Sequence, residues 1–256
     1  MRTSAGLHVT VWGDGEAAVF VHGSFGWGEE TWQEQRPLAD HYRLLLVDRR
    51  GFGGSPANGR VDFERDADDV ATVLGDGAHL VGHSYGGVVS LLAAAQRPEA
   101  VRSLTLIEPP AFGVARGTPA VEELIQNVGV AARDASDPAD YRLRFLQGFG
   151  FPGEPVSLEG AALEAARASM TERPPWEAEI PLDRLAAAGL RVLLVQRDWC
   201  PAPDTARALA GEAFRAVCDV LDKRLSAERA VFPAAHNAQR LGSLFNNRLR
   251  AFWEAD

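Results

Sequence analysis

The sequence predicts an α/β protein in which helices cover both faces of a mostly parallel sheet. Short apolar runs alternate with stretches of helical periodicity, which is the pattern of strands that are buried on both faces. The chain has 256 residues, 46% of them hydrophobic, and this is enough for a large core within one α/β domain. The predicted strands cover residues 7–12, 17–21, 43–47, 78–81, 101–107, 190–196 and 230–232.

Helical patterns fill most of the segments between these strands. Phe63, Ala67 and Val70 recur at helical spacing, so one face of that segment is apolar. The predicted helices cover residues 31–38, 63–74, 88–96, 205–214, 215–225 and 241–253.

Residues 109–181 interrupt the alternation of strand and helix. They contain three candidate helices, at 119–133, 138–147 and 157–170, and no convincing buried strand. In a sheet of this kind the ligand crevice lies at the carboxyl ends of the strands, so an insertion between two strands predicts a lid. The alternative is a set of helices packed only for stability. We therefore predict a core domain of residues 1–108 and 182–256 and a helical lid subdomain of residues 109–181.

Composition excludes several classes of partner. The formal net charge of −9 argues against nucleic acid and anionic membrane surfaces. There is no apolar run of about 18 residues and no N-terminal apolar segment, so we expect a cytoplasmic protein. Cys200 and Cys218 do not make a disulfide framework. No motif has metal-ligand or dinucleotide spacing, so we expect a small-molecule substrate and no metal or cofactor.

The stretch around Ser84 joins a predicted strand directly to a predicted helix. Residues 82–86 have the sequence Gly-His-Ser-Tyr-Gly, which fits the Gly-x-Ser-x-Gly pattern of a nucleophile elbow. A turn this tight strains the serine backbone and leaves no room for a Cβ on the flanking glycines. It also points a helix N-terminus at the place where an oxyanion would form. Ser84 is therefore the predicted nucleophile, and the alternative is a serine that only caps the helix.

His236 is the predicted base. A serine hydroxyl is a poor nucleophile until a base takes its proton, and histidine suits this work because its pKa lies near neutrality. In enzymes with the elbow, the chain order is serine, acid, histidine. Of the six histidines only His236 follows Ser84, in a loop after the last predicted strand. The alternative is an ordinary solvated loop residue.

Four segments, in this order, resemble the motifs of the α/β-hydrolase-fold superfamily. Residues 22–24 resemble its His-Gly oxyanion loop, and residues 48–55 resemble its Asp-x-Arg-Gly-x-Gly-x-Ser loop. Residues 82–87 match its elbow. Residues 233–236 resemble its Pro-Gly-Ala-Gly-His segment, with alanine in place of the second glycine. The resemblance covers essentially the whole chain and implies an eight-stranded type of sheet, a lid and a serine hydrolase.

The resemblance leaves the acid of the triad open. The usual family position follows the strand after the lid and here holds Cys200, with Asp198 two residues earlier and Asp204 farther on. The other family position is the end of the strand before the lid, where this chain has Glu108. The zearalenone-lactone hydrolases resemble this second arrangement. Glu108 is the predicted acid because its extra methylene helps it to reach a histidine. Asp198 and Asp204 stay as alternatives, and Glu108 would otherwise bind backbone or an arginine.

The resemblance also implies an oxyanion hole made by two backbone N–H groups. One is that of Tyr85, next to the nucleophile, and the other is that of Ser24, with Phe25 as the second choice. His22, Asp48 and Arg50 are expected to hold their turns by hydrogen bonding. His83 could either pack within the elbow or shape the pocket.

The predicted function is a serine hydrolase that cleaves an ester or lactone of an apolar small molecule, which can be aromatic. Aromatic side chains near the site suggest this preference, although half of them or more could be lid core. The predicted substrate contacts are Phe25, Tyr85, Phe149 and Trp176. The same triad could serve carbon–carbon bond hydrolysis, thioester cleavage or perhydrolysis. A small-molecule receptor with a residual triad is the alternative outside enzymes.

Overall fold

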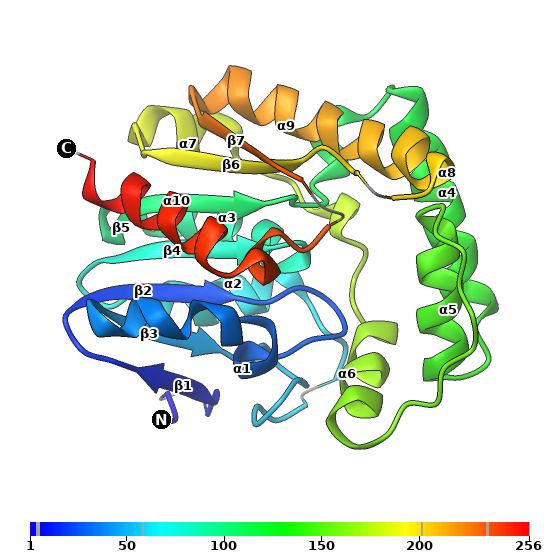
Figure 1. Cartoon of the computed structure of the whole chain (residues 1–256), viewed down its shortest axis with the longest axis horizontal. Coiled ribbons are helices and arrows are strands. Elements are labelled where there is room, and N and C mark those ends of the chain that lie inside the picture. The colour runs from blue at the N-terminus through cyan, green and yellow to red at the C-terminus, as the bar shows by residue number, and fades with distance from the viewer. Residues whose placement is uncertain (4–5, 58, 201, 234–235, 256) are drawn as a thin grey trace.

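The computed structural model describes residues 1–3, 6–57, 59–200, 202–233 and 236–255. Within them lies a seven-stranded sheet with the order β1-β3-β2-β4-β5-β6-β7 (Figure 1). β1 runs antiparallel to β3, and all other pairings are parallel. The strands are β1 (Val9–Trp12), β2 (Glu16–Val21), β3 (Tyr42–Val47), β4 (Ala78–His83), β5 (Val101–Ile107), β6 (Val192–Arg197) and β7 (Glu228–Phe232).

This sheet confirms the predicted α/β fold. Each of the seven predicted strands corresponds to an observed strand, and the differences are confined to the strand ends. The family resemblance implied an eight-stranded type of sheet, whereas the sheet in the described residues has seven strands. β1 and β7 form its two edges.

The two faces of the sheet carry separate cores, because successive side chains of a strand point to opposite faces. In β2, Val19 and Val21 belong to the cluster that includes α2 (Phe63–Val73) and α3 (Tyr85–Gln96). Phe20, between them, packs on the other face against Trp32 and Trp253, with ring centroids 5.0 and 6.2 Å away. Figure 1 accordingly shows α10 (Ser243–Glu254) in front of the sheet and α2 and α3 behind it.

The observed helices correct several predictions. The break predicted between residues 214 and 215 falls inside α9 (Glu212–Leu225). The segment predicted as one helix over 31–38 is a short helix, α1, followed by a 3-10 segment, and α7 was not predicted. The other helical elements are α1 (Gly28–Thr31), η1 (Gln33–Asp40), η2 (Pro98–Ala100), η3 (Phe112–Ala115), α4 (Pro119–Asp134), α5 (Pro138–Gly148), α6 (Gly160–Met170), η4 (Pro175–Glu177), α7 (Leu182–Ala188), α8 (Asp204–Ala206), η5 (Arg207–Gly211), α9 (Glu212–Leu225) and η6 (Ala238–Leu241).

The inserted helices stand beside the carboxyl ends of the parallel strands. In Figure 1 the arrows of these strands point toward the part of the molecule that holds α4, α5 and α6. α5 begins where the Asp137 side chain accepts hydrogen bonds from the N–H groups of Ala139 and Asp140, which fixes its first turn. No helix in the described part of the chain is long and apolar enough to cross a membrane.

The close approach of α3 to β2 generates a prediction about Gly86. A Cβ on Gly86 would lie 2.3 Å from the Val21 carbonyl oxygen and 2.5 Å from that of His22. We expect Gly86→Ala to lower the free energy of unfolding by about 1–3 kcal/mol, measured by urea denaturation. The control is Gly129→Ala in α4, where the nearest atom is 3.6 Å away at the end of the Arg133 side chain, and this variant should be neutral or stabilised. Equal stabilities of the two variants would contradict the prediction.

Candidate active site

Ser84 lies in the turn between β4 and α3 and has a strained backbone. Its φ of 51° and ψ of −125° are unfavourable for a residue with a side chain. The turn is held because the Ser84 N–H donates to the Ile107 carbonyl oxygen at 2.9 Å. A Cβ on Gly82 would lie 2.5 Å from the Gly86 carbonyl oxygen, so both flanking positions need glycine. The sequence pattern therefore forms the predicted elbow.

Three further residues with a side chain and a positive φ follow the ends of neighbouring strands. Phe25 (φ 64°) follows β2, Glu108 (φ 41°) follows β5 and Trp199 (φ 58°) follows β6. Each departure from the favoured region costs on the order of 1–3 kcal/mol, and such strain concentrates at functional sites. The strained residues thus indicate that the site lies at this edge of the sheet.

His236 and Glu108 are brought together at this edge. The Nδ1 atom of His236 lies 3.0 Å from Oε2 of Glu108. The other carboxyl oxygen, Oε1, accepts hydrogen bonds from the backbone N–H of Arg197 at 3.1 Å and from Nε1 of Trp199 at 3.0 Å. Glu108 is fully buried, so these donors replace the hydrogen bonds that water would otherwise make to its carboxyl group.

Burial disfavours a charge on either member of the pair. Burial raises the pKa of Glu108, while the positive charge of Arg197 and the hydrogen bonds from Trp199 and Arg197 favour its carboxylate form and oppose the shift. Burial, followed by the charge of Arg197, lowers the pKa of His236 to about 3. His236 is therefore neutral near pH 7, which is the state in which Nε2 can accept a proton.

The other two candidate acids lie elsewhere. Asp198 is exposed, and its carboxylate accepts a hydrogen bond from the Cys200 N–H at 2.9 Å. Asp204 forms an exposed ion pair with Arg207. Neither forms a hydrogen bond or ion pair with His236 in the described residues, so the geometry favours Glu108.

The two backbone N–H groups predicted to form the oxyanion hole have no acceptor among the described residues. In the described part of the chain, no hydrogen bond uses the backbone N–H of Ser24 or of Tyr85. The N–H of Phe25, the second choice, donates to Oγ of Ser169 at 2.9 Å. A Cβ on Gly23 would lie 2.8 Å from Cβ of Ser84, so the loop packs directly against the elbow.

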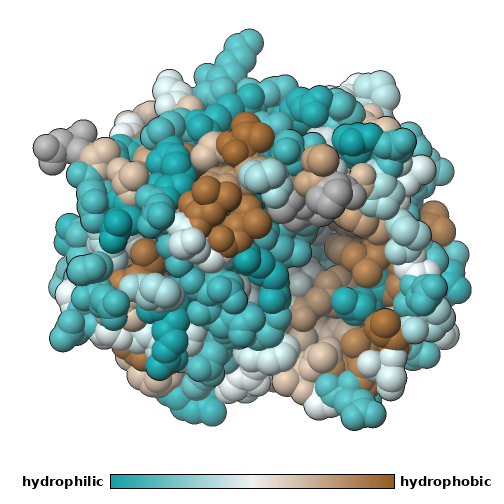
Figure 2. Space-filling model, viewed as in Figure 1, coloured by the Kyte–Doolittle hydropathy of each residue, from teal (hydrophilic) through white to brown (hydrophobic). Residues whose placement is uncertain are grey.

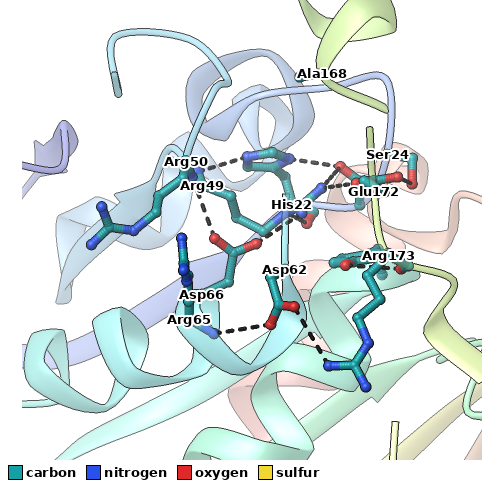
Figure 3. A network of polar contacts seen from close by, with 12 residues as sticks. His22, Ser24, Arg49, Arg50, Asp62, Arg65, Asp66, Ala168, Glu172 and Arg173 are labelled. Carbon is teal, nitrogen blue, oxygen red and sulfur yellow. Dashed lines mark hydrogen bonds and ion pairs between the residues drawn. The ribbon is translucent and has the colours of Figure 1, made fainter. Parts of the chain in front are cut away.

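A buried arginine holds this loop in place (Figure 3). Nε and Nη2 of Arg49 donate to the carbonyl oxygens of His22 and Gly23, at 3.0 and 3.1 Å. Its guanidinium also contacts two carboxylates, with Nη1 3.1 Å from Asp66 and Nη2 2.6 Å from Glu172. The guanidinium lies between two rings, 4.4 Å from the centroid of Phe52 and 4.5 Å from that of Tyr85.

Glu172, which the sequence did not single out, connects the inserted segment to the loop. One of its carboxyl oxygens contacts Arg49, and the other accepts a hydrogen bond from Oγ of Ser24 at 2.5 Å. Burial raises the pKa of Glu172, and the charge of Arg49 opposes this. The next residue, Arg173, accepts a hydrogen bond from the Tyr85 hydroxyl at 3.1 Å through its carbonyl oxygen. Both residues predicted to offer oxyanion N–H groups are therefore held through their side chains by residues 172–173.

His22 holds its turn by hydrogen bonds, as predicted, and His83 also contacts a neighbouring loop. Nε2 of His22 accepts from the Arg49 N–H at 3.0 Å, so its Nδ1 carries the proton and donates to the Gly23 carbonyl oxygen at 2.7 Å. Nε2 of His83 donates to the carbonyl oxygen of His236 at 3.2 Å and thus holds the loop that carries the proposed base.

The acidic and basic residues of the second motif also hold their turns. The carboxylate of Asp48 accepts from the N–H groups of Gly28 and Gly54, at 2.7 and 2.8 Å. Arg50 forms a two-pronged ion pair with Asp69, at 2.6 and 2.8 Å.

Ser84 lines two hollows of different character. One, which we call the apolar cavity, has a volume of about 440 Å³. The other, which we call the polar hollow, has a volume of about 260 Å³ and also contains His236. Figure 2 shows the surface hollowed between the part of the molecule that carries the sheet and the part that carries α5 and α6. The apolar cavity is lined by Ser24, Ser84, Tyr85, Pro110, Phe112, Ile125, Gln126, Val128, Gly129, Arg133, Tyr141, Phe145, Phe149, Glu172, Pro174, Pro175, Trp176 and Glu177. The polar hollow is lined by Gly23, Ser24, Phe25, Gly26, Glu30, Thr31, His83, Ser84, Arg142, Phe145, Leu146, His236, Asn237, Gln239 and Arg240.

The predicted substrate contacts divide between these hollows. Phe149, Trp176 and Tyr85 line the apolar cavity, and Phe25 lines the polar hollow. Trp199 is buried and donates to Glu108. Within the described residues, no group of three or more His, Cys, Asp or Glu side chains could hold a metal ion.

Comparison with known proteins identifies the family. The model of the alpha/beta hydrolase family matches residues 18–240, and the chain belongs to this family. This confirms the resemblance found in the sequence motifs.

Curated relatives and solved structures agree with this assignment. The chain is 33% identical over 193 residues to the pimeloyl-[acyl-carrier protein] methyl ester esterase of Aeromonas hydrophila. The aligned region covers 73% of this chain and 71% of that protein. It is 35% identical over 194 residues to the protein of the same name from Methylococcus capsulatus, with the same coverage of 73% and 71%. An alpha/beta hydrolase structure from Sphaerobacter thermophilus matches with a TM-score of 0.68 at 21% identity over 99% of both chains.

The Arg49 contacts generate the prediction for this site. Arg49→Gln leaves the buried carboxyls of Asp66 and Glu172 without their cation, so we expect a loss of about 3–5 kcal/mol in the free energy of unfolding. The matched control is Arg50→Gln, which breaks the more accessible pair with Asp69 and should cost about 1 kcal/mol or less. Chemical denaturation of both variants checks this, and equal losses would contradict it.

Proposed function

We propose that the chain cleaves a carboxylic ester of an apolar small molecule through an acyl-enzyme, with Ser84 as nucleophile, His236 as base and Glu108 as acid. The observation that carries this proposal is the contact of His236 with Glu108 beside Ser84, which lies in the strained elbow and lines the same hollow as His236. The predicted enzyme class, a carboxylic ester hydrolase, is confirmed by the family match and by relatives named as ester esterases.

The proposed reaction has two steps. His236 takes the proton of the Ser84 hydroxyl as its oxygen attacks the carbonyl carbon, and the oxyanion accepts hydrogen bonds from the N–H groups of Ser24 and Tyr85. The bond between the acyl carbon and the alcohol oxygen then breaks, and His236 gives the proton to the alcohol. Water attacks the acyl-enzyme by the same route and releases the acid. Throughout, Glu108 orients His236 and stabilises the imidazolium.

The shape of the site supports an apolar acyl group. The apolar cavity beside Ser84 is lined largely by aromatic and aliphatic side chains, among them Phe112, Phe149 and Trp176. Its volume of about 440 Å³ is in the range of small-ligand sites. A lactone would suit the same cavity if its acyl and alcohol parts are joined by an apolar chain.

We also propose that residues 109–181 form a lid subdomain over the core. α4 and α5 of this segment line the apolar cavity through Ile125, Val128, Tyr141 and Phe145. Since the cavity has a wall from each part, substrate selection would depend on how these helices pack.

Replacement of the proposed nucleophile tests the function. We expect Ser84→Ala to lower turnover of p-nitrophenyl butyrate by at least about 1000-fold, because the proposed mechanism forms the acyl-enzyme on the Ser84 hydroxyl. Thermal unfolding serves as the control for folding. Retained turnover in a folded variant would contradict the mechanism. Labelling of Ser84 by a fluorophosphonate without multiple turnover on any ester would favour a receptor.

A comparison of two acidic residues tests the proposed acid. Glu108→Gln keeps the size of the side chain but cannot stabilise the imidazolium, so we expect kcat to fall by about 100-fold or more. Asp198→Asn, at an exposed turn, is the matched control and should stay within about threefold of the wild type. Loss of kcat in Asp198→Asn alone would show that the acid is Asp198.

A further inference from the structure

Only one of the two hollows beside Ser84 contains the proposed base. His236 lines the polar hollow together with Gly23 and Ser24, and the described lining of the apolar cavity does not include it. In the proposed reaction His236 gives its proton to the departing alcohol, so the alcohol oxygen must lie on the side of His236. The acyl group then extends into the apolar cavity and the alcohol into the polar hollow.

The polar hollow contains one arginine that lacks a partner. One acidic side chain, that of Glu30, and two guanidinium groups, those of Arg142 and Arg240, line it. Glu30 and Arg240 form an ion pair with each other. No hydrogen bond, ion pair or ring contact in the described residues involves the side chain of Arg142, which is half-buried in α5. The hollow therefore has one uncompensated positive charge.

The other titratable groups of the hollow do not change this balance. Burial lowers the pKa of His83 well below its usual value, and it lowers the pKa of His236 to about 3, so both are neutral near pH 7. The carboxylate of Glu30 also accepts from the Thr31 hydroxyl at 3.3 Å. A positive charge in a hollow of a chain with a net charge of −9 is a local reversal of sign.

Arg133, the arginine that lines the apolar cavity, is a weaker candidate for binding an anion. It also lines a hollow with Ser84, but it is exposed, so water already solvates and screens its charge. Arg142 is less exposed to water than Arg133, so an anion paired with it would be screened less and held more strongly.

We propose that the polar hollow is a subsite for the leaving alcohol and that Arg142 pairs there with a carboxylate on that alcohol. A single uncompensated guanidinium suits a single negative charge, and the planar fork of arginine matches a carboxylate with two parallel hydrogen bonds. The substrate class is thus an ester with an apolar acyl group and an alcohol that bears a carboxylate. This inference rests on the proposed function, because it takes its orientation from the role of His236.

Three synthetic esters test it. The esters 3-carboxyphenyl butyrate and 3-carbamoylphenyl butyrate differ in the charge of the leaving group but little in size, and monophenyl glutarate carries its charge on the acyl side. For the wild type we expect kcat/KM to favour the carboxyphenyl over the carbamoylphenyl ester by about 10-fold or more, mainly through KM. Added NaCl should reduce this ratio.

Variants of α5 assign the preference to one residue. Arg142→Gln should bring the ratio to about one. The matched control is Arg144→Gln, which removes the same charge two residues away, where Arg144 pairs with Asp140 and lines neither hollow. It should keep the wild-type ratio. A ratio that survives in Arg142→Gln, or falls equally in both variants, would overturn the inference. A loss confined to monophenyl glutarate would place the charge on the acyl side and would also overturn it.

A binding measurement separates this inference from the proposed function. If the wild type hydrolyses none of the three esters, the proposed function fails, and calorimetry with the free alcohol 3-hydroxybenzoate then tests the subsite alone. Binding to the wild type that is about 10-fold weaker in Arg142→Gln, and weaker for 3-hydroxybenzamide, would support the subsite. Equal binding of the two alcohols, or none, would overturn it.

Discussion

The arrangement of the site depends on the buried guanidinium of Arg49. It contacts the loop after β2 through two carbonyl oxygens, α2 through Asp66 and the inserted segment through Glu172. Burying one cation with two carboxyls is costly, and such clusters add little net stability compared with apolar packing. The cluster instead fixes the positions of these segments, because its hydrogen bonds hold parts of the chain that lie outside the hydrogen bonding of the sheet.

The strained turns at the strand ends are held by hydrogen bonds to neighbouring strands. Ser84, Glu108 and Trp199 adopt a positive φ at consecutive places along the sheet, β4, β5 and β6. Each turn is held by neighbours that leave it little freedom: the Ser84 N–H bonds to the chain of β5, and the Glu108 N–H bonds to the Val195 carbonyl oxygen in β6. The parallel ladder therefore continues into the turns, which is how the sheet can hold side chains in unfavourable backbone positions.

The sequence could predict whatever depends on local pattern. The strands follow from apolar runs, the elbow follows from two glycines that leave no room for a Cβ, and His236 follows from its order in the chain. Glu172 and Arg142 could not be found in this way. The contacts of Glu172 and the proposed role of Arg142 depend on how the inserted segment packs against the loop after β2, and nothing in their local sequence distinguishes them from surface residues. The eight-stranded expectation came from the resemblance, whereas the apolar runs of this chain number seven.

The position of the proposed acid explains the unusual turn after β6. Where an acid follows that strand, its turn must present a carboxylate to the histidine, but here the turn presents donors. The backbone N–H of Arg197 and the indole N–H of Trp199 both donate to Oε1 of Glu108, and Trp199 does so from a turn in which its own φ is positive. A carboxylate at the neighbouring strand end would repel a second one on this turn. The turn after β6 therefore supplies hydrogen-bond donors to the buried oxygen of Glu108 and does not supply the proposed acid. An exposed Asp198 and a cysteine at position 200 agree with an acid supplied from the end of β5.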